Sequence, residues 1–103
     1  PQPDLVLARV VPGFRGVPNF KNALLVIEVS DSTYNYDRKV KAPLYARAGV
    51  PELWIVDCQN QRVEVHSGGK ADVYENVVNA DMSVILVPRL AANIRVQLAD
   101  LWE

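Results

Sequence analysis

Hydrophobic and polar positions divide the middle of the chain into a strand, a helix and a second strand. Residues 24–29 (LLVIEV) and 52–58 (ELWIVDC) are almost unbroken hydrophobic runs, which is typical of strands buried on both faces. The segment between them predicts a helix from about Thr33 to Ala48, with N-cap candidates at 30–33 and Gly49 placed to end it. Two strands joined in this way should be parallel, with a right-handed crossover.

The faces of this predicted helix follow from its spacing. Val40 and Leu44 are expected to face the sheet. The neighbouring stripe, at i, i+4 spacing, consists of Asp37, Lys41 and Tyr45. Lys41 should therefore lie at the margin of the buried face, where its long stem can pack while its ammonium group reaches a polar pocket.

The remaining segments are shorter and are bounded by proline, glycine and polar residues. Pro43 should kink or divide the predicted helix, because it removes an amide donor. Residues 62–66 (RVEVH) alternate as in a half-exposed strand, and residues 67–70 (SGGK) predict a hairpin loop before a returning strand at 72–78. The other predictions are a strand at 4–11, a surface loop at 13–22, strands at 83–87 and 94–96, and a terminal helical turn at 98–102.

Composition and length indicate one soluble globular domain of 103 residues, half of them hydrophobic. The longest hydrophobic runs are too short to span a bilayer, so no membrane partner is expected, and the start has no signal-peptide pattern. The single cysteine, Cys58, excludes an internal disulfide, and a cytoplasmic location is the simplest expectation. The net charge of -1 gives no global attraction to nucleic acid, so any DNA-binding surface must be local.

Glu28 interrupts the first hydrophobic run and needs an explanation. A carboxylate in such a place is costly to desolvate unless a cation or hydrogen-bond donors meet it. Lys41 and Asp4 are the candidate neighbours, and two carboxylates from adjacent strands could hold one cation. Magnesium prefers oxygen ligands and keeps several waters, so the backbone carbonyl of Val29 would suffice as a third protein ligand. The sequence has no histidine or cysteine cluster of the kind that binds zinc.

Each of these residues also has a purely structural interpretation. Asp4 can simply begin a strand after a proline, and Asp37 with Lys41 can form a surface ion pair worth about 0.3–0.5 kcal/mol. His66, on the alternating strand, is expected to be solvated rather than catalytic. Asp57, which closes the second buried strand, is expected to cap neighbouring backbone amides rather than bind a metal.

Four segments together resemble a known family. Residues 3–4 (PD), 28–32 (EVSDS), 37–41 (DRKVK) and 45–57 (YARAGVPELWIVD) resemble the Uma-two family of restriction endonucleases, in the PD-(D/E)xK nuclease superfamily. The last segment is the most specific. The resemblance implies a restriction-endonuclease-like core with a mixed α/β (α+β) sheet, a parallel strand-helix-strand crossover and a C-terminal antiparallel hairpin.

The same resemblance covers nearly the whole chain, residues 1–103, as a single nuclease-like domain. It also implies an N-terminal helix and strand that are missing here. The chain begins at Pro1 without an initiator methionine, so we expect a cropped or processed piece of a longer protein.

Carried over residue by residue, the resemblance assigns roles in a nuclease site. Asp4 and Glu28 would be the two acids that hold Mg²⁺, with Mn²⁺ as an alternative. Ser30 stands where the superfamily has its lysine, so Lys41 on the helix is expected to replace it. Ser30, Asp37 and Tyr45 match supporting positions. The local DNA-binding surface is expected to include Arg38, Lys39 and Arg47, with Arg15 and Lys21 as further candidates.

Three functions follow from this sequence. The leading hypothesis is a magnesium-dependent endonuclease that hydrolyses DNA phosphodiester bonds, with Lys41 aligning the attacking water. The second is an interaction or scaffold protein that keeps the nuclease fold and cleaves little or nothing. The third is a hydrolase of small phosphate esters, because the metal chemistry is shared. A homodimer is compatible with all three.

Overall fold

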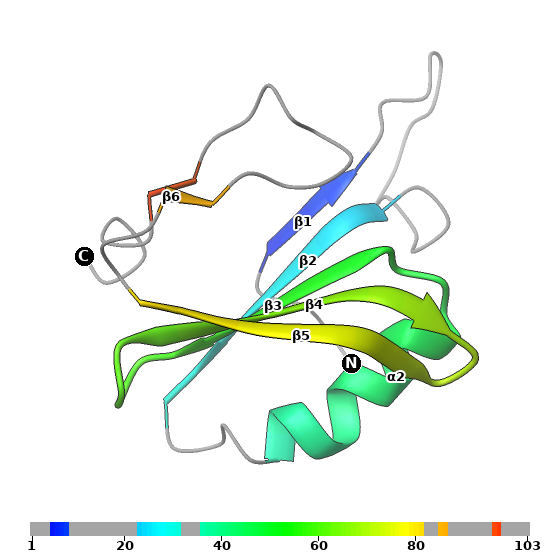
Figure 1. Ribbon diagram of the computed structural model, residues 1–103, viewed down its shortest axis with the longest axis horizontal. Helices are drawn as coiled ribbons and strands as arrows, with labels where there is room; N and C mark the ends of the chain where they lie inside the picture. The colour runs from blue at the N-terminus through cyan, green and yellow to red at the C-terminus, as the bar shows by residue number, and fades with distance from the viewer. Residues whose placement is uncertain (1–4, 9–22, 32–35, 82–84, 87–95, 98–103) are drawn as a thin grey trace.

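The computed structural model describes residues 5–8, 23–31, 36–81, 85–86 and 96–97 (Figure 1). Five strands form one sheet in the order β1-β2-β3-β4-β5, and two short strands, β6 and β7, pair separately. A helical segment lies between β2 and β3 in the chain. The strands are β1 (Leu5–Ala8), β2 (Ala23–Ser30), β3 (Glu52–Asp57), β4 (Arg62–Lys70), β5 (Val73–Asp81), β6 (Ile85–Leu86) and β7 (Val96–Gln97); the helices are η1, a π-helix (Asp37–Lys41), and α2 (Ala42–Arg47).

The pairing of β2 with β3 is parallel, and the pairings of β1 with β2, β3 with β4 and β4 with β5 are antiparallel. The predicted parallel strand-helix-strand unit is therefore confirmed, and so is the antiparallel hairpin that follows it. All six residues of β3, at the centre of the sheet, are buried. The fold is a mixed α+β sheet, as the sequence predicts.

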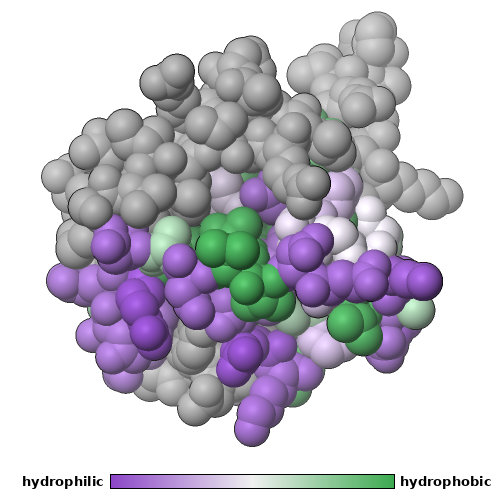
Figure 2. Space-filling model, viewed as in Figure 1, coloured by the Kyte–Doolittle hydropathy of each residue, from purple (hydrophilic) through white to green (hydrophobic). Residues whose placement is uncertain are grey.

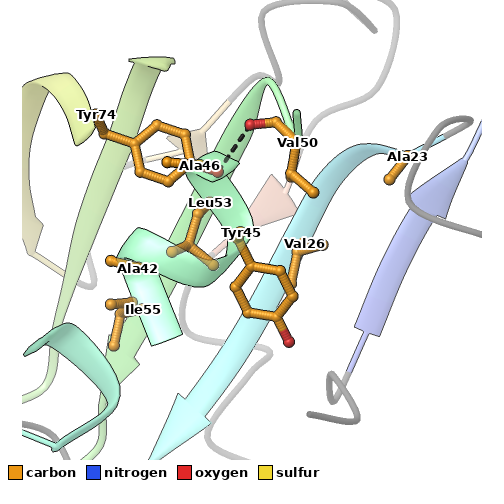
Figure 3. Packing of buried hydrophobic residues seen from close by; sticks show 9 residues of the cluster. All are labelled: Ala23, Val26, Ala42, Tyr45, Ala46, Val50, Leu53, Ile55 and Tyr74. Atoms are coloured by element: carbon orange, nitrogen blue, oxygen red, sulfur yellow. Dashed lines mark hydrogen bonds between the residues drawn. The ribbon is translucent and has the colours of Figure 1, made fainter. Parts of the chain in front are cut away.

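The helical segment packs on one face of the sheet (Figure 1). Figure 3 shows Tyr45 of α2 lying over Val26 of β2, with its hydroxyl at the edge of the hydrophobic cluster. A second cluster fills the opposite face of the sheet around Trp54. The helix-side cluster consists of Ala23, Val26, Ala42, Tyr45, Ala46, Val50, Leu53, Ile55 and Tyr74, and the opposite cluster of Leu25, Ile27, Trp54, Val56 and Val63.

The predicted faces of the helix are wrong. Val40 is 40% exposed and Leu44 36%, whereas Ala42, Tyr45 and Ala46 are buried. Val40 and Leu44 do share one stripe at i, i+4 spacing, but the stripe next to it, which carries Ala42, Tyr45 and Ala46, is the one that faces the sheet. The spacing identifies the stripes of a helix, and it does not say which of them is buried.

Two boundary residues of the helix behave as predicted. Pro43 stands in the first turn of α2, and the helix changes from π to α beside it. Gly49 follows the helix with φ of 85°, a conformation that glycine adopts without strain. The expected division at Pro43 and the expected end at Gly49 are both confirmed.

The predicted hairpin loop at 67–70 is wrong, because these residues continue β4. Gly69 pairs with Tyr74 and Lys70 with Val73, so the turn falls at 71–72. A Cβ built on Gly69 would lie 3.4 Å from the Tyr74 ring. Gly69 therefore allows the Tyr74 ring to pack closely against the β4 backbone, a common role of glycine within a strand.

The outer surface of β5 carries three exposed hydrophobic residues, Val73, Val77 and Val78. In the view of Figure 2 the described surface is mostly hydrophilic, with a hydrophobic patch near its centre. Among the described residues, no helix is long and apolar enough to cross a membrane. The predicted loop at 13–22 and the helical turn at 98–102 lie outside the described residues.

Candidate active site

Glu28 lies on the face of β2 that the helix covers. It pairs in register with Ile55 of β3, a member of the helix-side cluster, and is 1% exposed. The hydrophobic residues before Glu28 bury this part of β2, and the acid is buried with them. An ionised carboxylate in that position requires partners.

Two side chains from the helix supply those partners. The Tyr45 hydroxyl donates to Glu28 Oε1 at 2.6 Å, and Lys41 Nζ donates to Glu28 Oε2 at 3.3 Å. The Tyr45 side chain is buried, whereas that of Lys41 keeps 23% of its area exposed. Each oxygen of the carboxylate thus has a donor, and the ammonium group lies between the buried acid and the surface.

The structure brings together Glu28, Lys41 and Tyr45, which come from β2, η1 and α2. Lys41 ends the π-helical turn, and Tyr45 follows one turn later in α2. Asp4, the other predicted acid, lies outside the described residues, as does the side chain of Asp37.

The other predicted residues on β2 flank this cluster. Ser30 is buried, pairs in register with Asp57 of β3, and accepts a hydrogen bond from the Cys58 amide at 2.9 Å through its backbone carbonyl. Val29 follows Glu28 directly, and its side chain is 39% exposed.

The Glu28 carboxylate is a suitable ligand for a hard cation such as Mg²⁺. A carboxylate oxygen has about two lone pairs, so one hydrogen bond to each oxygen of Glu28 leaves further capacity to accept a metal. Mg²⁺ is commonly held by one or two carboxylates together with waters and substrate phosphate. In the described part of the chain, no three His, Cys, Asp or Glu side chains converge, so a metal ion at Glu28 would need further ligands from waters, substrate or residues outside that part.

The basic residues predicted to contact DNA differ in their surroundings. Lys39 is exposed. Arg38 Nε contacts Oε1 of Glu64 at 3.0 Å, and Arg47 contacts Asp72 at 3.9 Å on the surface. Arg38 and Arg47 each keep more than half of the side chain exposed, so both still present charge to solvent.

A second pair of buried polar residues lies on β4, and the sequence did not predict its burial. Glu64 and His66 are each 4% exposed, and His66 Nε2 lies 2.5 Å from Glu64 Oε1. The prediction that His66 is solvated is therefore wrong. Burial lowers the pKa of His66, with Glu64 opposing that effect. The alternating pattern at 62–66 does place both residues on one face, but that face is covered rather than exposed.

Asp57 has the structural role predicted for it. Its Oδ1 accepts a hydrogen bond from the Asn60 amide at 3.3 Å, and its Oδ2 accepts one from Asn60 Nδ2 at 2.8 Å. The acid therefore stabilises the turn between β3 and β4.

One cavity lies away from these residues, at the end of α2. Its volume is about 390 Å³, and it contains none of the predicted site residues. It is lined by Ala46, Gly49, Val50, Pro51, Glu52, Gly68 and Gly69. The candidate site is thus the cluster at Glu28 rather than this cavity.

Comparison with known proteins supports a nuclease fold. The model of the Uma2 family, described as "Putative restriction endonuclease", matches residues 1–99. A solved structure described as a "putative nuclease belonging to DUF820", from Anabaena variabilis, is similar with a TM-score of 0.59 and 17% sequence identity. The match covers 78% of this chain and 44% of that one, so the chain spans less than half of that protein's length. No curated protein sequence matches the chain.

Proposed function

Because the chain belongs to the Uma2 family, whose model is described as "Putative restriction endonuclease", we propose that it is a metal-dependent endonuclease acting on DNA. The observation that carries the proposal is the buried Glu28 carboxylate, held by Tyr45 and Lys41. A buried acid with an ammonium group at its solvent side is a suitable arrangement for binding a metal ion and a phosphate.

Each residue of this cluster has a distinct task in the proposed reaction. Tyr45 fixes the orientation of Glu28, because its hydroxyl donates to one carboxylate oxygen. Lys41 orients the attacking water and offsets negative charge that develops on the phosphate in the transition state. Glu28 would hold Mg²⁺ or Mn²⁺, and such an ion, when bound, polarises the phosphate and lowers the pKa of a bound water.

Asp4 is proposed as the second metal-binding acid. At the last described pair of the two strands, Leu5 of β1 faces Ile27 of β2. Asp4 precedes Leu5 in the chain, and Glu28 follows Ile27, so each acid is one residue from that pair. The backbone carbonyl of Val29 is proposed as the third protein ligand, since it comes directly after Glu28.

DNA is proposed to bind over η1 and α2 through its phosphates. Lys39 and the exposed parts of Arg38 and Arg47 supply positive charge on this side of the molecule. Contacts of this kind position a duplex without reading its sequence. Because each contact between a basic side chain and a phosphate releases counterions from DNA, binding should weaken with added salt.

A plasmid-nicking assay tests the proposal. Supercoiled DNA is incubated with the purified protein and Mg²⁺ or Mn²⁺, with EDTA as the metal-free reaction. We expect metal-dependent nicking that falls by about 100-fold or more in both Glu28→Gln and Lys41→Met, because each removes a group that meets developing charge. Glu75→Gln, the same kind of change at an exposed residue of β5, is the matched control and should nick normally.

Two outcomes would contradict the proposal at different levels. Full activity in both Glu28→Gln and Lys41→Met would overturn the site. No nicking by the wild-type protein with either metal would overturn the nuclease activity and favour a nuclease-fold scaffold. Cleavage of a small phosphate diester without nicking of plasmid would identify the third function.

A further inference from the structure

Two buried acids lie in one row across the helix-covered face of the sheet. Glu28 of β2 pairs with Ile55 of β3, and Ile55 pairs with Glu64 of β4. The two carboxylates are 1% and 4% exposed as residues. Since neighbouring strands lie about 4.8 Å apart, the two strands that carry the acids are separated by about 10 Å.

One turn of helix supplies a cation to each acid. Within η1, Arg38 contacts Glu64 at 3.0 Å, while Lys41 contacts Glu28 at 3.3 Å. Residues three apart in an α-helix share a face. In this π-helical turn, Arg38 and Lys41 instead contact acids on β4 and β2, the two strands that flank β3. Single π-helical turns within α-helices frequently occur at functional sites.

The contact at Glu64 differs from the contact at Glu28 in the cation that makes it and in the histidine beside it. The same Glu64 oxygen that contacts Arg38 also contacts His66 Nε2. His66 is itself buried and packs edge-to-face with Tyr74, with 5.7 Å between the ring centroids. Arginine presents a planar, rigid group, whereas lysine carries its charge on a flexible stem. The Arg38 contact is therefore suited to fix η1, and the Lys41 contact depends on where η1 lies.

We propose that Glu64, supported by His66, is a positioning residue for the candidate active site. Through Arg38 it holds η1 at the height and rotation at which Lys41 reaches Glu28. The catalytic consequence rests on the proposed nuclease function, whereas the effect on the location of Lys41 does not. This gives Arg38 a task beyond contact with DNA phosphate.

The location of Lys41 can be measured without any substrate. The rate of reductive methylation of each lysine, read by mass spectrometry, reports the access of reagent to its ammonium group. In Glu64→Gln and in Arg38→Met we expect the Lys41 rate to rise several-fold, towards that of exposed Lys39. Asp72→Asn breaks the surface ion pair of the same helical segment and should leave the Lys41 rate unchanged.

The two variants guard against a trivial loss of folding. Glu64→Gln alters a buried group, but the Arg38 side chain is 52% exposed, so Arg38→Met should fold normally. Thermal melting is recorded for both. An unchanged Lys41 rate in folded Glu64→Gln and folded Arg38→Met would overturn the proposal.

Turnover separates positioning from DNA binding. Glu64→Gln should lower kcat for nicking by about 10- to 100-fold, as expected when a catalytic group is displaced by about 1 Å, and leave KM for DNA within about twofold. Arg38→Met should lower kcat similarly, and the double variant should be no slower than the slower single variant, because both act through one contact. A raised KM in Arg38→Met with an unchanged kcat in Glu64→Gln would make Arg38 a DNA contact and overturn the inference.

Failure of the inference and failure of the proposed function can be told apart. If the wild-type protein nicks no DNA but the methylation rate of Lys41 rises in both variants, the nuclease proposal fails and the positioning of Lys41 by Glu64 stands. If the protein nicks DNA and neither variant changes kcat or the Lys41 rate, the function stands and the positioning role fails.

Discussion

The two faces of the sheet are built differently, although the same strands form both. The face opposite the helix is filled by Leu25, Ile27, Trp54, Val56 and Val63. The helix-covered face has a larger hydrophobic cluster, and it also buries Glu28, Glu64 and His66. The first face also buries one acid, Glu52 at the start of β3, which accepts a hydrogen bond from Trp54 Nε1. The second face gathers several buried ionisable groups beneath the helix, and each of them needs a specific partner, so chemistry is more readily placed there.

The largest expected effect on stability lies on the face opposite the helix. Trp54→Ala should lower the free energy of unfolding by about 3–5 kcal/mol, because it leaves a cavity at the centre of the cluster. It also removes the indole donor that meets Glu52 Oε2 at 2.7 Å. Urea unfolding followed by circular dichroism measures the change. A loss below about 1 kcal/mol would show that this face is not the main source of stability.

On the helix-covered face, Tyr45→Phe should have a smaller effect. It keeps the buried ring and removes the hydroxyl that donates to Glu28, and hydrogen bonds to charged groups contribute about 1.5–3 kcal/mol. Urea unfolding again gives the free energy. The same variant should slow nicking, because the Glu28 carboxylate loses a fixed orientation. Unchanged stability and unchanged nicking together would show that this hydrogen bond neither stabilises the fold nor orients Glu28.

His66 predicts a pH dependence that comes from the helix-covered face alone. Its pKa in the folded protein is lowered by burial from 6.5, so the unfolded chain binds more protons below that pH. Stability should therefore fall as pH decreases from 6.5 towards the lowered folded value, and remain level above it. Urea unfolding at several pH values should show this decrease in the wild type and a smaller one in His66→Gln. Equal decreases in both would assign the effect to other groups.

The smallest effect is expected at the surface of the helical segment. Asp72→Asn removes the partner of Arg47 at 3.9 Å, where both side chains are more than half exposed. Exposed pairs contribute little, so the free energy of unfolding should change by less than about 0.5 kcal/mol. A larger loss, measured in the same urea experiment, would mean that the end of α2 depends on this ion pair.

The sequence predicted best what depends on hydrophobic runs. Strands β2 and β3 and their parallel crossover follow from two long buried segments, and the argument that buried Glu28 needs a cation leads to Lys41, which is found in contact with it. The catalytic roles of these residues stay predictions. What the sequence missed depends on tertiary packing: which stripe of the helix faces the sheet, because neighbouring stripes both carry hydrophobic residues, and the burial of His66, because alternation does not say what covers each face.

The π-helical turn at residues 37–41 has a consequence for anyone who aligns this chain with its relatives. Such a turn contains more residues than an α-helical turn, so losing one residue there would leave an ordinary α-helix rather than a broken one. A residue lost between Arg38 and Lys41 would also leave these two residues only two positions apart. Lys41 would keep its contact with Glu28, while Arg38 would no longer be spaced to share a helix face with Lys41 and reach Glu64. A one-residue gap at this point of an alignment would therefore mark relatives that hold the lysine by some other means.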